Sequence, residues 1–137
     1  MSNLESNKAL TRREQEEFWA GGNAALADVL FAAQVTEGDG RVVTPTDLTA
    51  QMQMQRNAAP DLQIRVLDQI AEGDRVVSRL EITGTHLGEW QGIPPTGRRF
   101  AMTGMVMRRI AGDKIVERWD SLDWLGAFQQ LGLIPAM

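Results

Sequence analysis

Residues 62–120 alternate apolar and polar side chains with a period of two, and this pattern limits the fold more than any other feature of the chain. Because strand side chains point to opposite faces of a sheet in turn, the pattern predicts strands buried on one side only. The expected strands cover residues 62–70, 75–86, 99–110 and 114–120, and the first three carry their apolar residues at even positions. Glycine-containing turns at 71–74 and 111–114 predict antiparallel hairpins, and a longer loop, 87–98, joins the middle pair.

Helical patterns precede these strands. Helices are expected over 7–19, 24–33 and 48–57, with a fourth and shorter one over 124–131. The expected helix caps are Asn23, Thr46 or Asp47, and Asp123. Residues 37–46 are expected to form a loop or a short irregular strand, and the charged residues of the first helix are expected to face solvent. Helices followed by an antiparallel meander indicate an α+β fold, with the helices on one face of a curved sheet.

Length and composition are those of one globular domain covering residues 1–137. The chain is 43% hydrophobic and 23% charged, and its net charge of -4 argues against a nucleic-acid partner. It has no cysteine and one histidine, which excludes disulfides, thiolate nucleophiles and a multi-histidine zinc site. The polar N-terminus and the lack of a long apolar run predict a cytoplasmic protein with no membrane partner.

Several polar residues fall on the expected inner face of the sheet. They are Ser78, His86, Arg108, Arg118 and Asp120. Buried polar groups need partners, so such a group of residues is expected to pair internally or to face a ligand, unless a bulge swaps the faces. Asp120 has two interpretations. In the first, Asp120 is a strand-end carboxylate that is solvated or caps the helix that follows. In the second, Asp120 lies in an apolar pocket that raises its pKa.

Two long segments, 60–100 and 108–134, carry motifs that resemble the SnoaL-like polyketide cyclase or ester cyclase family of the nuclear-transport-factor-two-like superfamily. The motifs are THLGEWQGIPPTGR at 85–98 and GDKIVERWDSLDWLGAFQQLG at 112–132, and residues 7–32 resemble the opening helices of the family. The resemblance implies a cone-shaped α+β barrel with an apolar pocket that binds a small apolar molecule. It also implies a homodimer packed through the outer face of the sheet.

The same resemblance implies a role for Asp120, which matches the residue that serves as acid and base in an intramolecular aldol closure without a cofactor. A carboxylate with a raised pKa suits that chemistry, because it can take a proton beside a carbonyl and return it to the new alkoxide. The chain departs from the cyclases at Gly104 and Val106, which stand where the family has a glutamine and a histidine facing the acid. His86 either replaces the missing partner or anchors the 87–98 loop.

The leading hypothesis is a cofactor-independent tailoring enzyme that acts on an apolar, polyketide-like carbonyl compound. Asp120 would be catalytic, with Arg118 or His86 tuning it. The residues expected to bind substrate are Trp19, Trp90, Met102, Val106, Arg118 and Trp119. Alternatives are a non-catalytic, dimeric small-molecule-binding protein, a cofactor-free hydroxylase, and an epoxide hydrolase built on Arg79 and Glu81. That last pair falls on the outer face, where a cross-strand salt bridge or a dimer contact is the better interpretation.

Overall fold

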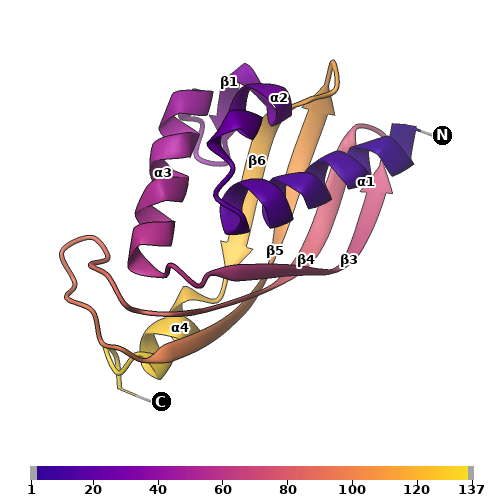
Figure 1. Cartoon of the computed structure of the whole chain (residues 1–137). Coiled ribbons are helices and arrows are strands. Elements are labelled where there is room, and N and C mark those ends of the chain that lie inside the picture. The colour runs from indigo at the N-terminus through magenta and orange to yellow at the C-terminus, as the bar shows by residue number, and fades with distance from the viewer. Residues whose placement is uncertain (1–2, 136–137) are drawn as a thin grey trace.

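A computed structural model describes residues 3–135 as an α+β fold (Figure 1). The helical elements are α1 (Asn3–Arg13), η1 (Glu14–Ala20, a π-helical continuation of α1), η2 (Ala24–Leu26, 3-10), α2 (Ala27–Leu30), α3 (Pro45–Ala58) and α4 (Trp124–Gln130). The strands are β1 (Phe31–Glu37), β2 (Val42–Val43), β3 (Gln63–Glu72), β4 (Arg75–Thr85), β5 (Arg99–Ala111) and β6 (Lys114–Leu122). This architecture confirms the predicted fold class.

The strands form one curved sheet in the order β2-β1-β6-β5-β4-β3. Neighbouring strands are antiparallel except β1 and β6, which run parallel. Helices α1, α2 and α3 cover one face of the sheet, and α4 lies at the end where the long β4–β5 loop folds back (Figure 1). The sheet is therefore mixed but mainly antiparallel, as predicted, with its inner face enclosed by helices.

Two strands contain bulges that exchange their inner and outer faces. In β3 the register shifts between Val66 and Asp68. In β6 the bulge lies between Ile115 and Glu117, because these two residues pair with the adjacent residues Ile110 and Arg109 of β5. A bulge adds one residue, so the period-two pattern changes phase there. Ile70, predicted to be buried, is consequently 73% exposed, and the odd-numbered Ile115 is fully buried.

The prediction of one helix over residues 24–33 was partly wrong, because the helix ends at Leu30. Phe31 has extended backbone angles and begins β1, which pairs with β6. The apolar run through Leu30 and Phe31 suits a buried helix and a buried strand equally well, so its period could not separate them. The third helix begins earlier than predicted, with Thr44 and Asp47 forming a capping box around Pro45.

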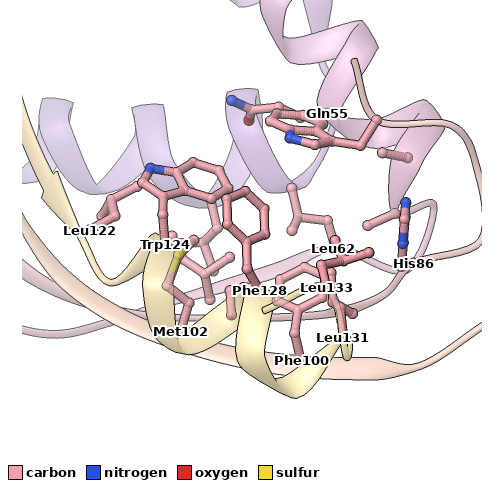
Figure 2. A pocket seen from close by; sticks show the side chains of 16 residues that line it. Gln55, Leu62, His86, Phe100, Met102, Leu122, Trp124, Phe128, Leu131 and Leu133 are labelled. Atoms are coloured by element: carbon pink, nitrogen blue, oxygen red, sulfur yellow. The ribbon is translucent and has the colours of Figure 1, made fainter. Parts of the chain in front are cut away.

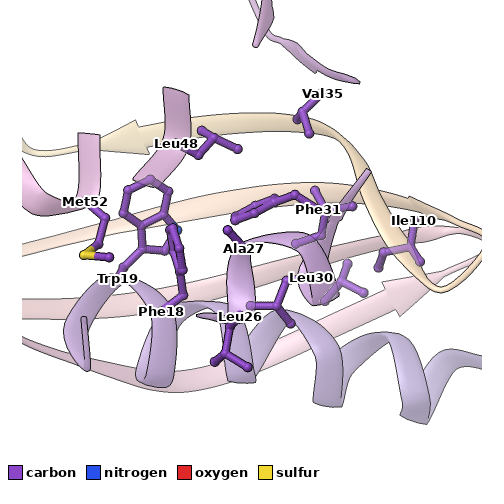
Figure 3. Close-up of a cluster of buried hydrophobic side chains, with 12 residues drawn as sticks. Phe18, Trp19, Leu26, Ala27, Leu30, Phe31, Val35, Leu48, Met52 and Ile110 are labelled. Carbon is purple, nitrogen blue, oxygen red and sulfur yellow. The ribbon is translucent and has the colours of Figure 1, made fainter. Parts of the chain in front are cut away.

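The buried apolar residues form two clusters along the inner face. The first lies under α1, α2 and α3 and contains the T-shaped pairs of Phe18 with Trp19 and with Phe31 (Figure 3). The second cluster, centred on Leu80, Met102 and Val106, lies towards α4. Within residues 3–135, no helix has both the length and the apolar character needed to cross a membrane.

Candidate active site

An apolar pocket opens at the α4 end of the sheet. Among residues 3–135, the pocket is lined by Gln55, Ala58, Ala59, Leu62, Ile64, Ile82, His86, Trp90, Phe100, Met102, Leu122, Trp124, Ala127, Phe128, Leu131 and Leu133 (Figure 2). These residues come from the end of α3, strands β3 to β6, the 87–98 loop and the C-terminal segment. The cavity volume is about 90 Å³, which is less than a drug-sized ligand fills. The pocket therefore suits a narrow apolar group, or a larger one once its aromatic side chains move.

Aromatic side chains form the wall where the pocket meets solvent. The rings of Trp90 and Trp124 stack with centroids 5.7 Å apart, and Phe128 lies 6.0 Å from Trp124. The loop that carries Trp90 is fixed to α3, because the backbone N–H groups of Leu87 and Gly88 both donate to the carbonyl of Ala58 at 2.9 and 3.0 Å. The long loop is thus part of the pocket wall.

His86 supplies one of the few polar groups in this lining. Its side chain is 4% exposed, and the backbone N–H of Thr96 donates to its Nδ1 at 3.2 Å. The hydroxyl of Thr96 lies 3.1 Å from the same nitrogen. These contacts provide the loop anchor that the sequence allowed for, and they leave Nε2 without a hydrogen-bond partner among residues 3–135.

A network of buried charges occupies the inner face beyond the pocket. Arg108 is 1% exposed, and its Nε lies 3.0 Å from Oε1 of Glu14 while its Nη1 lies 2.6 Å from Oδ1 of Asp120. Arg118 holds the other oxygen, with Nη2 3.0 Å from Oδ2 of Asp120, and its Nη1 lies 3.2 Å from Oε1 of Glu37. Both oxygens of Asp120 therefore accept charge-assisted hydrogen bonds.

These contacts reverse the predicted protonation of Asp120. Burial raises its pKa, but the charges and hydrogen bonds of Arg108 and Arg118 outweigh burial and lower the pKa to about 2. Glu37 shifts the other way, because burial and the charge of Asp120 raise its pKa despite the nearby Arg118. Asp120 is therefore ionised at neutral pH, and the expectation of a carboxyl group with a raised pKa was wrong.

Asp120 is a neighbour of the pocket and not one of its described lining residues. Its side chain is 31% exposed, and it precedes the lining residue Leu122 by two positions on the same face of β6. Two residues of strand span about 7 Å. Asp120 therefore lies one same-face position along β6 from the lining residue Leu122.

The structure divides the predicted site residues between these two regions. Trp90, Met102 and His86 line the pocket. Val106 packs in the second core cluster and is the register partner of Asp120. The polar residues predicted on the inner wall do pair internally, including Ser78, which accepts from Gln69 at 3.1 Å.

Two predicted substrate-binding tryptophans lie elsewhere. Trp19 is buried in the first core cluster, where its Nε1–H donates to Glu14 at 2.8 Å and the guanidinium of Arg118 lies 5.2 Å from its ring. Trp119 points to the face opposite Asp120, beneath the guanidinium of Arg75 at 5.5 Å. Neither lines the described pocket, so both expectations need correction.

His86 and Asp120 are also separated. Along the paired strands, Ser78, Val106 and Asp120 lie at one level, and His86 follows Ser78 by eight residues. This spacing corresponds to a strand contour of about 25 Å. His86 therefore does not replace the missing partner of Asp120.

Two groups of site residues were missed from the sequence. The first is Trp124 and Phe128 on α4 with Leu131 at its C-cap, whose spacing of four and three residues was the available signal for an apolar helix face. The second is Glu14, which is fully buried although its charged neighbours suggested a solvated helix face. Thr11 and Phe18, one turn before and after Glu14, are also fully buried, and their spacing marks that face.

Arg79 and Glu81, the outer-face residues for which salt bridges were predicted, each form a cross-strand ion pair. Arg79 bonds Asp68 at 3.2 Å, and Glu81 lies 3.6 Å from Arg65. Both residues face away from Asp120, which speaks against an epoxide-hydrolase arrangement. Within residues 3–135, no group of three or more acidic or histidine side chains is placed to hold a metal ion.

A curved sheet covered on one face by helices, with an apolar pocket at one end, places this chain among the cone-shaped α+β proteins. Residues 9–131 match the SnoaL-like polyketide cyclase family, and the chain belongs to that family. The fold is shared with TsrD from Streptomyces laurentii, at a TM-score of 0.87 and 24% identity over 98% of this chain and 100% of that one. AclR from Streptomyces galilaeus superimposes with a TM-score of 0.85 and 29% identity, over 98% of this chain and 86% of that one.

Curated relatives match over a shorter stretch. The aklanonic acid methyl ester cyclase DnrD of Streptomyces peucetius is 40% identical over 60 residues, 44% of this chain and 41% of that protein. The nogalonic acid methyl ester cyclase of Streptomyces nogalater is 38% identical over 60 residues, 44% of this chain and 45% of that protein. The match thus spans less than half the length of each relative.

Proposed function

We propose that this protein is a cofactor-independent enzyme that closes a ring by intramolecular aldol addition in an apolar, polyketide-like carbonyl compound. The observation that carries the proposal is the position of Asp120, an ionised and partly exposed carboxylate two residues along β6 from Leu122 in the lining of an apolar pocket. The relatives named as cyclases of aklanonic and nogalonic acid methyl esters support the substrate class.

In the proposed reaction, the carboxylate of Asp120 removes a proton from a carbon that lies between two carbonyl groups. The electron pair of that C–H bond delocalises into the carbonyls and then forms a C–C bond with a second carbonyl carbon of the same molecule. The resulting alkoxide takes the proton back from Asp120, so the product is an isomer of the substrate. Conjugated carbonyls of the substrate stabilise the enolate, which is why the scheme includes no cofactor.

Arg108 and Arg118 position the base in this scheme. Their hydrogen bonds fix both carboxylate oxygens, so the carboxylate needs no reorganisation when the substrate arrives. A low pKa makes a weak base. A bound substrate would cover the exposed third of the side chain, and the loss of water raises the proton affinity of a carboxylate.

An Asp120→Asn variant tests this proposal with aklanonic acid methyl ester as the substrate. Ring closure followed by liquid chromatography should fall by about 10²- to 10⁴-fold, because the acid/base group is lost, while substrate affinity stays within about threefold. Asp68→Asn is the matched control, since Asp68 pairs with Arg79 on the outer face. Full turnover by the Asp120→Asn variant would refute the assigned role.

A second candidate is a non-catalytic protein that binds an apolar small molecule. Gly104 and Val106 favour it, because they stand where cyclases carry polar partners for the acid. Binding of the same ester without any turnover by the unaltered protein would select this alternative.

A further inference from the structure

Five charged side chains form one continuous network on the inner face of the sheet. The ion pairs run in the order Glu14, Arg108, Asp120, Arg118 and Glu37, and these side chains are between 0% and 31% exposed. No other ion pair within residues 3–135 involves any of the five. Three carboxylates and two guanidinium groups leave a net charge of -1 when all are ionised. Because unbalanced charge away from water is costly, the network favours the uptake of one proton.

Glu37 is the carboxylate that this network holds least firmly. Nε of Arg108 lies 3.0 and 3.1 Å from the two oxygens of Glu14. Asp120 accepts from two guanidinium groups, at 2.6 and 3.0 Å. Glu37 has one side-chain hydrogen bond within the described chain, from Nη1 of Arg118 to its Oε1 at 3.2 Å, although its side chain is only 17% exposed. Glu37 is therefore the member of the network that binds the extra proton most readily.

The charged groups that face Glu37 come from three parts of the fold. They are Arg118 and Asp120 on β6, Arg108 on β5, and Arg41 in the turn between β1 and β2. Burial raises the pKa of Glu37 above its ordinary value of 4.5, and the charge of Asp120 adds to this effect. The three guanidinium groups lower the pKa without cancelling the rise. The surroundings of Glu37 thus agree with the charge balance of the network.

Arg118 is the physical link between Glu37 and Asp120. Glu37 and Arg118 are register partners across the parallel strands β1 and β6, and Asp120 follows Arg118 by two residues on the same face. Nη1 of Arg118 contacts Glu37 and its Nη2 contacts Asp120, while the ring of Trp19 lies 5.2 Å from the guanidinium carbon. The two carboxylates share one planar cation, so each senses the charge of the other.

We propose that Glu37 is a positioning residue that sets the base strength of Asp120 through the guanidinium of Arg118. When Glu37 is ionised, Arg118 divides its charge between two carboxylates, and Asp120 is a stronger base. When Glu37 is protonated, Arg118 stabilises the charge of Asp120 alone, and Asp120 is a weaker base. The coupling exists with or without a reaction, whereas its effect on ring closure rests on the proposed function.

Carbon-13 NMR of the side-chain carboxyl groups measures the coupling directly. In the unaltered protein the Glu37 signal should titrate with a midpoint above pH 4.5. In Asp120→Asn the midpoint should move to lower pH, because a like charge has been removed and Arg118 is free to bind Glu37 alone. Asp68→Asn is the control and should leave the midpoint unchanged, since Asp68 pairs with Arg79 on the outer face. A Glu37 midpoint at or below pH 4.5, or the same midpoint in Asp120→Asn, would overturn the proposal.

The pH dependence of ring closure provides the second test. Asp120 is ionised in the free protein from pH 4 to pH 8, so a base acting alone would give a constant kcat/KM over this range. With the coupling, kcat/KM for aklanonic acid methyl ester should rise about threefold to tenfold as Glu37 ionises. Glu37→Gln should remain at the lower value at every pH, whereas a purely structural loss would leave the rise in place. Glu81→Gln is the matched control and should keep the rise, because Glu81 pairs with Arg65 on the outer face.

The outcomes separate this inference from the proposed function. A Glu37 midpoint that falls in Asp120→Asn, without ring closure by the unaltered protein, would support the coupling and reject the enzyme. Ring closure that requires Asp120, with the same pH profile in Glu37→Gln as in the unaltered protein, would do the reverse. If Glu37→Gln does not fold, the NMR titrations of the unaltered protein and of Asp120→Asn still decide.

Discussion

Nη1 of Arg108 lies 2.6 Å from Oδ1 of Asp120, and the same guanidinium bonds Glu14 through Nε at 3.0 Å. One buried cation therefore joins a carboxylate of the first helical segment to a carboxylate near the end of the last strand. The contact fixes Asp120 beside the pocket and keeps it ionised. It also makes the acid/base candidate part of the framework that connects the two ends of the chain.

Stability should fall with acid in a way that depends on Asp120. Its folded-state pKa of about 2 lies below the ordinary value of 3.8, so ionisation stabilises the fold above about pH 4, and that contribution is lost as pH falls towards 2. Because the side chain is partly exposed, we expect a contribution of about 1 to 2 kcal/mol. Urea unfolding of the unaltered protein and of Asp120→Asn, at several values from pH 7 to pH 2, measures it.

The difference in unfolding free energy between these two proteins should be largest at neutral pH and should shrink below pH 4. Asp68→Asn removes a carboxylate from a more exposed ion pair and should show a smaller pH-dependent difference. A difference between Asp120→Asn and the unaltered protein that is constant down to pH 2 would contradict the lowered pKa.

Replacement of Arg108 should be among the most damaging single changes to the fold. Arg108→Met keeps much of the buried volume but leaves Glu14 fully buried, with the Trp19 N–H as its remaining side-chain hydrogen bond within residues 3–135. An uncompensated buried charge costs about 3 to 5 kcal/mol. Denaturant midpoints measure the loss, and Arg79→Met on the outer face should change them little.

The double variant Glu14→Gln with Arg108→Met sharpens that experiment. It removes both charges, so it should recover a large part of the stability lost in Arg108→Met alone. No recovery would mean that Arg108 stabilises the fold through Asp120 or by packing, and not by compensating Glu14.

Period-two patterning predicted most of the sheet, because residues such as Val76, Leu80 and Met102 face the core without interruption. It failed where a bulge was inserted, since an extra residue in β3 or β6 leaves no mark in the hydrophobic pattern itself. Strand β1 was missed for a related reason. Its pairing with β6 is parallel and long-range, and local sequence contains little information about such a partner.

The site was predicted in part. The pattern placed Arg108, Arg118 and Asp120 on one face, but the pKa of Asp120 depends on guanidinium distances that no spacing rule provides. The α4 wall of the pocket was missed because the sequence pattern predicts only a short helix over 124–131, whereas Trp124 at its start is 40% exposed and lines the pocket. Whether an aromatic residue packs inward or lines an opening depends on the path of the loop beside it, which only the tertiary structure defines.

Gly104 should not tolerate a side chain. A steric limit of this kind would account for glycine at a position where the resemblance to the cyclases implies a glutamine. A Cβ at this position would lie 2.5 Å from the carbonyl oxygen of Ser121 and 2.8 Å from Cα of Leu122, both in the backbone of β6. Gly104→Ala should therefore destabilise the protein by about 1 to 3 kcal/mol in thermal or urea unfolding. Gly84→Ala is the matched control, because its added methyl would meet only the side chains of Phe100 and Ala59 at 3.1 and 3.2 Å.

An unaltered unfolding midpoint in Gly104→Ala would show that β5 and β6 separate easily. In that case the absence of the glutamine would have no steric cause, and Gly104→Gln together with Val106→His would be a fair test for gain of cyclase turnover. If the midpoint falls as expected, the close approach of β6 explains why this chain carries glycine there.

Trp124 should control how fast ligands leave the pocket. Its ring lines the pocket, stacks on Trp90 at 5.7 Å and is 40% exposed, so it stands between the apolar interior and solvent. Trp124→Ala should raise the dissociation rate of bound 1-tetralone about tenfold, measured by stopped-flow fluorescence of the remaining tryptophans. Stability should fall by about 1 to 3 kcal/mol, because the truncation removes partly buried apolar surface as well as the aromatic pair. Leu125→Ala is the control, because Leu125 is 45% exposed on the same helix and is not part of the described lining. Equal dissociation rates in Trp124→Ala and Leu125→Ala would mean that ligands leave by another route, and the 87–98 loop beside Trp90 would be the next segment to test.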